Sequence, residues 1–250
     1  MLAAERRDLL LATLRRDGKI VAKTAAAELG LSEDSIRRDL RELAAEGLCQ
    51  RVYGGALPVS PAVADYAGRR QVAVAGKERV AAAAVRLIDP GSTVILDGGT
   101  TALAVAAALP PDLRCTVVTH SPTVATALVE HPVADVIVLG GRLFKHSAVT
   151  SGAATVEAAQ HVSADLFLLG VTGIHPDAGL TTGDPDEAAT KRALAARAAE
   201  TYVLGSSEKV GAASPFRVVG FDDVAGVVTD ADLASDVVHA LRERVRVLPA

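Results

Sequence analysis

Residues 29–40 read Leu-Gly-Leu-Ser-Glu-Asp-Ser-Ile-Arg-Arg-Asp-Leu, and this stretch sets the organisation of the N-terminal region. Ser32 is a residue type that caps helix N-termini, and the two acids after it favour the positive end of a helix dipole. Apolar residues at 36, 40 and 43 then recur at helical spacing. The pattern predicts a helix that starts at Ser32, directly after a turn at Gly30, and runs to Gly47.

The flanking segments complete a small DNA-binding arrangement. The expected elements are an amphipathic helix over 2–16 closed by Asp17-Gly18, a β-like run at 19–22, a helix over 24–29 and a two-stranded wing over 48–57. A tight turn at Gly30 between two helices is what a helix-turn-helix requires. Gly54-Gly55 supplies a turn or a close approach within the wing. We therefore predict a winged helix-turn-helix domain over residues 1–57.

The helix after Ser32 presents a basic face. Its outward positions carry Ser35, Arg37, Arg38 and Arg41. Arginine suits DNA recognition because its guanidinium bonds a guanine edge at two points or a pair of phosphate oxygens. In the wing, Arg51 and Tyr53 are placed to touch the DNA backbone. The alternative is that the arginines belong to a solvated face and pair with the acids at 33, 34 and 42.

Net charge alone does not identify a DNA-binding protein here. The 250-residue chain has a formal net charge of −4 at pH 7. Residues 1–57 carry 10 Lys and Arg against 9 Asp and Glu, and the remaining residues carry 16 against 21. Neither part is strongly basic, so the prediction of DNA binding rests on where the arginines stand rather than on their number.

Composition narrows the class of protein. A hydrophobic content of 50% supports a sizeable core and argues against disorder. No apolar run approaches the roughly 18 residues that span a bilayer, and the charged start is unlike a secretory signal. Cys49 and Cys115 are too few for a disulfide framework or a zinc site. We expect a cytoplasmic protein with no membrane partner, no metal and no cofactor.

The rest of the chain predicts a linker over 58–75 and an α/β domain over 76–250. Short apolar runs suggest strands at 94–96, 116–118, 136–139, 166–169, 202–204 and 226–228. Alanine-rich helices are expected between them, at 76–87, 101–109 and 187–199. Continuous apolar strands that alternate with helices indicate a mostly parallel sheet covered on both faces.

Ligands of such sheets bind at the carboxyl ends of the strands, so residues that follow a strand are the candidate binding residues. Asp97-Gly98-Gly99-Thr100-Thr101 leads from the first strand into a helix, and its glycines, hydroxyls and helix start suit a phosphate. The other candidates are Thr119, His120, Ser121, Gly140, Gly141, Glu187, Lys191 and Lys209. Plainer interpretations stay open, namely ordinary turns at the two Gly-Gly pairs, an exposed ion pair between Glu187 and Lys191, and a polar rim position for His120.

These motifs together resemble the DeoR family of bacterial transcriptional regulators. The N-terminal part of the resemblance rests on residues 29–40, Glu46-Gly47 and Tyr53-Gly54-Gly55-Ala56. The remainder rests on LDGGTT at 96–101, VVTHS at 117–121, VLGG at 138–141, GVTGI at 170–174 and EAATKR at 187–192. The resemblance implies that Ser35, Arg37 and Arg38 contact DNA from the major groove. Asp39 is expected to orient a neighbouring arginine rather than to contact a base.

The resemblance also implies a C-terminal effector domain similar in fold to ribose-5-phosphate isomerase and to related sugar-phosphate and CoA-transferase enzymes. Its implied ligand is a phosphorylated sugar or a close metabolic intermediate. The matching positions are Asp97, Gly99, Thr100, Thr101, Thr119, Ser121, Glu187, Lys191 and Lys209. Two departures bear on ligand identity. His120 stands where the family often has Asn, and Ser206-Ser207-Glu208-Lys209 stands where it often has Asp-Ser-Ser-Lys.

Two functions from different classes follow from these observations. The favoured one is a transcriptional regulator, more specifically a repressor of carbohydrate-metabolism genes, that a phosphorylated sugar releases from double-stranded operator DNA. We expect it to bind the operator as a homo-oligomer of at least two chains. An activator would use the same parts. The rival is a sugar-phosphate isomerase or deaminase with an appended DNA-binding module, in which Asp97 or Glu187 would act as a base beside Lys191 or Lys209.

Overall fold

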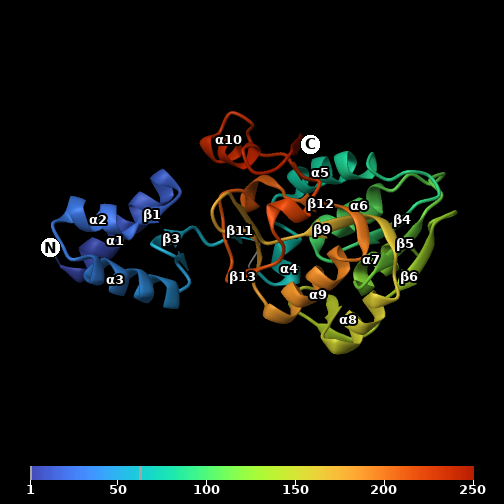
Figure 1. Ribbon diagram of the computed structural model, residues 1–250, viewed down its shortest axis with the longest axis horizontal. Coiled ribbons are helices and arrows are strands. Elements are labelled where there is room, and N and C mark those ends of the chain that lie inside the picture. The colour runs from blue at the N-terminus through green and yellow to red at the C-terminus, as the bar shows by residue number, and fades with distance from the viewer. Residues whose placement is uncertain (1, 62–63) are drawn as a thin grey trace.

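The basic helix found in the sequence lies in a small domain at one end of the molecule (Figure 1). The computed structural model describes residues 2–61 and 64–250, so Met1 and two residues of the predicted linker, Ala62 and Val63, lie outside the described residues. The elements of the small domain are α1 (Ala3–Asp17), β1 (Ile20–Val21), α2 (Ala22–Leu29), α3 (Glu33–Ala45), β2 (Gln50–Val52) and β3 (Gly55–Leu57). This order confirms the predicted winged helix-turn-helix fold.

Local signals account for the turn and the start of α3. Gly30 has a φ of 64°, the left-handed conformation that commonly ends a helix. The Ser32 hydroxyl accepts a hydrogen bond from the Ser35 amide at 3.2 Å and so caps α3. The apolar face of α3 packs into a buried cluster that includes Leu10, Leu14, Ile20, Ile36, Leu40 and Leu43. Burial of this face leaves the arginines of α3 on the outside.

The predicted two-stranded wing is joined by the β-like run expected at 19–22, which forms β1, so the sheet has three antiparallel strands in the order β1-β3-β2. Both wing glycines are required by the geometry. Gly54 turns the chain with a φ of 82°. A Cβ atom on Gly55 would lie 1.7 Å from the Ile20 carbonyl oxygen, so only glycine lets β3 approach β1. The turn and the close approach expected from Gly54-Gly55 are thus both present.

The larger domain is built on a seven-stranded sheet in the order β15-β14-β12-β9-β4-β5-β6, and every neighbouring pair is parallel. The strands are β4 (Thr93–Leu96), β5 (Thr116–Thr119), β6 (Asp135–Val138), β9 (Ala164–Gly170), β12 (Ala198–Leu204), β14 (Gly226–Thr229) and β15 (Val247–Pro249). All strands expected from apolar runs are present, and the α/β fold class predicted from the sequence is confirmed.

Helices cover both faces of this sheet (Figure 1). One face packs against α5 (Val74–Val85), α6 (Thr100–Ala108) and α7 (Pro122–Leu128). The other packs against α8 (Ala153–Gln160), α9 (Pro185–Ala195) and α10 (Asp236–Arg242). In β4, Val94 and Leu96 belong to the first layer and Ile95 to the second. The inner strands are therefore buried on both sides, which explains why they are almost wholly apolar, whereas the edge strand β6 is largely exposed.

Several elements differ from the sequence prediction or were not predicted. The third predicted helix was expected to reach residue 199, but α9 ends at Ala195, since Ala198 pairs with Ala164 of β9 and starts β12. Small strands form two further sheets, one of β7 (Arg142–Phe144) and β8 (Val149–Ser151), the other of β10 (Gly173–His175), β11 (Gly179–Thr182) and β13 (Phe216–Arg217). Over the described residues, no helix is long and apolar enough to cross a membrane.

The segment predicted as a linker makes contacts with the larger domain. Val59 forms a parallel β-bridge with Ala213. Farther on, the short helix α4 (Tyr66–Arg69) brings Arg69 against the larger domain, where its Nη2 atom donates to the His146 carbonyl at 2.9 Å. The exact domain boundaries stay a prediction, but the connection between the domains is held at two points.

Candidate functional site

The outer face of α3 exposes the arginines that the sequence singled out. Arg37, Arg38 and Arg41 are all exposed. Arg37 donates to Glu33 one turn earlier, with Nη2 at 2.7 Å from Oε1, so the pairing left open by the sequence occurs for this residue. Within the described residues, Arg38 and Arg41 have no ion pair with an acid. Two of the three guanidinium groups are therefore free for an external anion.

The wing stands beside this face. A hollow of about 130 Å³ between α3 and the wing is lined by Arg37, Arg51 and Tyr53. Tyr53 lies at the wing turn with its whole side chain in solvent. The structure thus brings a basic helix and a basic wing strand to one surface, which is the arrangement that contacts base edges and adjacent phosphates in DNA.

Two polar residues of α3 act within the domain. Ser35 is half-buried, and its hydroxyl lies 3.0 Å from that of Ser32, so it also supports the helix cap. Asp39 is buried and binds Arg6 of α1 through both carboxylate oxygens, with Arg6 Nη2 at 2.8 Å from Oδ1. The expectation that Asp39 orients a neighbouring arginine is wrong: its partner is Arg6, and the pair fastens α1 to α3.

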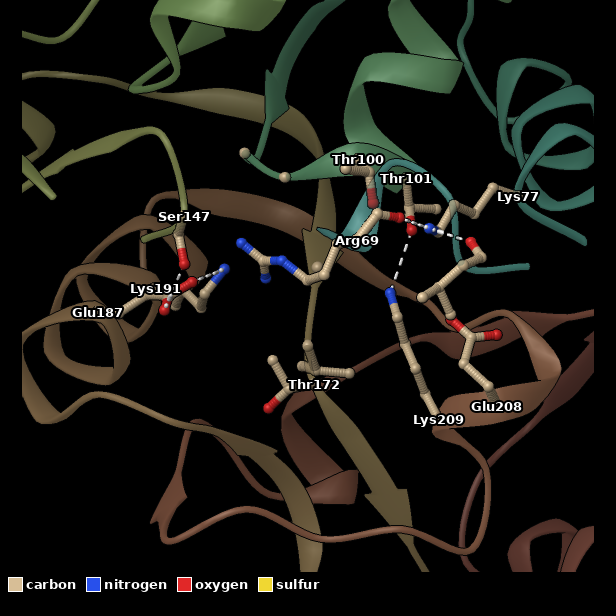
Figure 2. Close-up of a pocket in the computed structure, with 15 residues that line it drawn as sticks. Arg69, Lys77, Thr100, Thr101, Ser147, Thr172, Glu187, Lys191, Glu208 and Lys209 are labelled. Atoms are coloured by element: carbon tan, nitrogen blue, oxygen red, sulfur yellow. Dashed lines mark hydrogen bonds and ion pairs between the residues drawn. The ribbon is translucent and has the colours of Figure 1, made fainter. Parts of the chain in front are cut away.

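The second candidate site is a pocket at the carboxyl ends of β4, β9 and β12, three neighbouring strands at the centre of the sheet (Figure 2). Its volume is about 30 Å³. Its polar lining comprises Arg69, Lys77, Thr100, Thr101, Ser147, Thr172, Glu187, Lys191, Glu208 and Lys209, together with backbone at Gly98, Gly99 and Gly170. Seven of the candidates predicted from the sequence line it directly: Gly98, Gly99, Thr100, Thr101, Glu187, Lys191 and Lys209.

Asp97 holds the floor of the pocket in place. Its fully buried carboxylate accepts hydrogen bonds from the Gly98 amide at 2.8 Å, from the Gly170 amide at 2.7 Å, from His120 Nε2 at 2.7 Å and from Lys191 Nζ. Burial opposes its ionisation, but the charge of Lys191 and the bond from His120 outweigh it and lower the pKa of Asp97. Asp97 therefore ties the turns after β4 and β9 to α9.

Lys191 and Glu187 form a buried pair on α9, not the exposed pair that the sequence left open. Lys191 Nζ lies 3.3 Å from Glu187 Oε1, and both side chains are buried. The pKa of Lys191 is raised overall, because the effect of burial, which alone would lower it, is outweighed by the charges of Asp97 and Glu187. The Ser147 hydroxyl donates to the other Glu187 oxygen at 3.2 Å. The charge of Lys191 is thus already balanced within the protein.

Lys209 forms no ion pair with an acid in the part of the chain that the structure describes. Its Nζ donates to the Thr101 hydroxyl at 3.1 Å, and the residue is only 6% exposed. Burial, assisted by the charges of Lys77, Arg69 and Lys191 and opposed by Glu208, lowers the pKa of Lys209 to about 8. The amine lies beside the start of α6, where the Gly99-Thr100 backbone adds the positive potential of a helix N-terminus. An anion placed here would relieve the repulsion among the lysines.

Arg69 and Lys77 are site residues that the sequence prediction missed. Both are buried, and burial lowers the pKa of each. Lys77 Nζ donates to the Arg69 and Val72 carbonyls. Figure 2 shows the guanidinium of Arg69 reaching across the pocket, and its Nε has no hydrogen-bond partner. A lysine within the alanine-rich stretch of α5 was a usable signal for Lys77, whereas nothing local marked Arg69.

Besides Asp97, five candidates from strand ends do not line the pocket and instead hold the chain around it. They are Thr119, His120, Ser121, Gly140 and Gly141. His120 is fully buried between Asp97 and the Thr150 carbonyl, so it supports Asp97 from behind. Ser121 caps α7. The Gly140 carbonyl accepts the Thr155 hydroxyl at 2.9 Å, and a Cβ on Gly141 would lie 2.1 Å from that hydroxyl.

A larger outer hollow adjoins the pocket. It has a volume of about 250 Å³ and shares Arg69, Ser147, Thr172 and Glu187 with the inner pocket. Phe144, His146 and Asp184 complete its wall. The two spaces together offer cations inside and, outside, hydrogen-bonding groups with the rings of Phe144 and His146.

Comparison with known proteins confirms the family. Residues 6–62 match the family described as DeoR-like helix-turn-helix domain, and residues 72–231 match the family described as DeoR C terminal sensor domain. The chain belongs to the DeoR family. With a matched DNA-binding domain and sensor domain, this DeoR-family protein is a DNA-binding transcriptional regulator.

Its relatives are similar over almost their whole length. The DeoR-family chain is 32% identical to the HTH-type transcriptional regulator GlpR of Haloferax volcanii over 94% of this chain and 93% of that protein. It is 30% identical to the glycerol-3-phosphate regulon repressor of Escherichia coli strain K12 over 97% of each. It is 29% identical to the HTH-type transcriptional repressor GlcR of Bacillus subtilis over 92% of this chain and 89% of that protein.

Among solved structures, ribose 5-phosphate isomerase A from Methanocaldococcus jannaschii is similar at a TM-score of 0.40 and 17% identity, over 53% of this DeoR-family chain and 52% of that chain.

Proposed function

We propose that this protein is a repressor of carbohydrate-metabolism genes that a phosphorylated sugar releases from operator DNA, with the phosphate bound in the inner pocket. The observation that carries the proposal is the set of three buried cations, Arg69, Lys77 and Lys209, whose side chains contact no carboxylate within the described residues. Buried cations are costly unless an anion pairs with them. A phosphate beside Lys209 and the Gly99-Thr100 backbone would supply it.

The surroundings of the pocket favour a sugar phosphate over a bare anion. Glu187 and Ser147 stand between the cations and the outer hollow, where Asp184 adds another carboxylate. Carboxylates repel a phosphate but accept hydrogen bonds from hydroxyl groups. A ligand with an anionic group at one end and hydroxyl groups at the other would place the anion among the inner cations and the hydroxyls beside the outer carboxylates. Glycerol 3-phosphate, which the name of the glycerol-3-phosphate regulon repressor contains, belongs to the same chemical class.

The rival enzymatic function finds little support in the geometry. A catalytic base must be free to take a proton from the substrate. Asp97 accepts four hydrogen bonds and is fully buried, and Glu187 is engaged by Lys191 and Ser147. The relatives are named as regulators and repressors. Sugar-phosphate turnover that Glu187→Gln abolishes would restore the enzymatic hypothesis.

DNA binding through α3 and the wing leads us to propose a homo-oligomer of at least two chains. Operators bound by helix-turn-helix dimers have half-sites spaced by whole DNA turns. A ligand releases such a dimer only if it binds better to a state in which the two basic helices no longer match the half-sites. The sensor pocket must therefore communicate with the position of the DNA-binding domain.

The test is fluorescence anisotropy on labelled DNA from upstream of this protein's own gene, at one fixed salt concentration. The added compounds are glycerol 3-phosphate, fructose 1-phosphate, glucose 6-phosphate and N-acetylgalactosamine 6-phosphate, each with its unphosphorylated parent, and inorganic phosphate. We expect tight, sequence-dependent binding that one phosphorylated sugar releases and its parent does not. Lys209→Ala should bind the same DNA but respond less. Tight binding that no phosphorylated compound weakens would refute the ligand class.

A further inference from the structure

The inner pocket is too small for the phosphate end of the proposed ligand, whose hydroxylated end would lie in the outer hollow of about 250 Å³. The inner volume of about 30 Å³ corresponds to about two water molecules, which is less than the heavy atoms of a phosphoryl group occupy. A phosphoryl group can enter between Lys209 and the α6 turn only if part of the wall moves outward. The identity of the moving wall therefore determines what else in the molecule changes when the ligand binds.

Most of the wall is fixed to the sheet. The turns after β4 and β9 are held by the buried Asp97 carboxylate through the Gly98 and Gly170 amides. The α9 wall is held by the buried bond from Lys191 to the same carboxylate. Moving any of these would break a fully buried charge network, which is among the most costly changes in a protein interior.

Two other parts of the wall make no bond to the Asp97 carboxylate. One is α4, a four-residue helix that carries Arg69. The other is the short 3-10 helix η2 (Ser207–Lys209), which carries Glu208 and Lys209. Each contributes a buried polar atom with no hydrogen-bond partner, namely Arg69 Nε and Glu208 Oε2. Unsatisfied buried groups favour rearrangement toward a ligand that bonds them.

The chain that leaves η2 runs directly to the connection between the domains. Val210 bridges Ile174, and the Gly211 amide donates to the Ile174 carbonyl at 2.9 Å. The buried Ala213 then forms the parallel bridge with Val59, and its amide donates to the Pro58 carbonyl at 3.5 Å. Ala213 is thus four residues beyond the pocket amine of Lys209.

On its other side, the same bridge adjoins the wing. Val59 is two residues beyond β3, the central strand of the wing sheet, which ends at Leu57. The chain after Val59 returns to the pocket through Arg69. The bridge between Val59 and Ala213 is therefore flanked along the chain by the wing and by the two parts of the pocket wall, α4 and η2, that do not bond Asp97.

We infer that entry of the sugar phosphate and formation of the Val59–Ala213 bridge exclude one another, so that this bridge is the switch between the sensor pocket and the DNA-binding domain. The inference rests on the proposed function and adds the mechanism of release. The ligand draws η2 and α4 outward, Ala213 leaves Val59, and the wing loses its fixed orientation. The bridged form binds the operator, and the open form binds the ligand.

The first test removes the bridge without any ligand. Ala213→Pro abolishes the amide that donates to Pro58, and Ala213→Gly at the same position keeps it. We expect Ala213→Pro to bind operator DNA about tenfold or more weakly than Ala213→Gly, a size typical of coupling between sites. Equal affinity of the two folded variants would overturn the inference, whatever the ligand proves to be.

The second test fixes the bridge with a disulfide and applies if Ala213→Pro does not fold. Paired residues on adjacent strands are about 5 Å apart, a separation that a disulfide spans. Oxidised Val59→Cys/Ala213→Cys protein should bind the operator like its reduced form but resist release by the four sugar phosphates named above, and reduction should restore release. Wild-type protein and the single-cysteine variants, under the same oxidant, control for Cys49 and Cys115, which are both buried.

Release of the fully cross-linked protein at the same ligand concentration as the reduced protein would overturn the inference. If the proposed ligand class is wrong, the result is different, because none of the compounds would then release the wild-type protein from operator DNA. In that case the comparison of Ala213→Pro with Ala213→Gly still decides whether the bridge controls DNA binding.

Discussion

Burial holds the pKa of Lys209 at about 8, so ligand binding should weaken as the pH rises from 7 to 9. The amine is protonated below its pKa and neutral above it, which makes about nine-tenths of Lys209 charged at pH 7 and about one-tenth at pH 9. A phosphate monoester, with a second pKa near 6, stays a dianion across this range. If only the charged amine binds the phosphate, the apparent Kd rises about tenfold between pH 7 and pH 9.

The assay is isothermal titration calorimetry with the releasing sugar phosphate at pH 7, 8 and 9 and constant ionic strength. The matched control is Lys209→Arg, because a guanidinium keeps its charge throughout this range. That variant should show a nearly flat profile. The pKa of Lys77 is also lowered by burial, and the control separates its effect from that of Lys209. A flat wild-type profile, or an equally steep profile for Lys209→Arg, would refute the assignment of the phosphate to Lys209.

Three further predictions concern other parts of the molecule. The double variant Arg38→Ala/Arg41→Ala should bind operator DNA more weakly, and the slope of log affinity against log salt concentration should fall by about 0.9 for each DNA phosphate no longer neutralised. Its melting temperature should not change, and Arg242→Ala, at another exposed arginine, is the control. Unfolding of the double variant would show a structural role instead. Asp39→Asn should lower the melting temperature, measured by circular dichroism, because the buried partner of Arg6 is removed; weaker DNA binding at full stability would contradict this. Gly98→Ala should lower both the melting temperature and the sugar-phosphate response in anisotropy, because the new Cβ would lie 2.0 Å from Val149 Cγ1. Gly140→Ala is the control and should change neither, because the space around its Cβ is open.

The DNA-binding domain could be predicted in detail because its signals are local. The cap at Ser32, the turn at Gly30 and the helical spacing of Ile36 and Leu40 act within a few residues of chain. The parallel sheet was predictable for a similar reason, since strands covered on both faces are continuous apolar runs. The strand Val247–Pro249 escaped because its apolar run is very short and ends in proline.

The pocket was predictable only in part. Thr101 follows β4 and Lys209 follows β12, and the carboxyl ends of parallel strands meet at one edge, so their positions indicated a common site. Glu187 was indicated only by its spacing from Lys191 on a helix. Arg69 reaches the same place from the segment before the first strand of the sheet, through tertiary contacts that no local pattern encodes. His120 lies at the expected edge but points at Asp97, because a buried carboxylate needs hydrogen-bond donors behind it as well as in front.

The solvent-exposed Tyr53 at the turn of the wing gives the protein an intrinsic optical label. The chain contains no tryptophan and three tyrosines, and of these Tyr202 is buried and Tyr66 is half-buried. Tyrosine fluorescence of the unmodified protein therefore includes emission from Tyr53 of the wing, whose ring is accessible to solvent. A soluble quencher such as acrylamide should act mainly on Tyr53, and DNA that covers the wing should protect it. Docking of the wing and its release by a ligand can then be followed in time without attaching a dye.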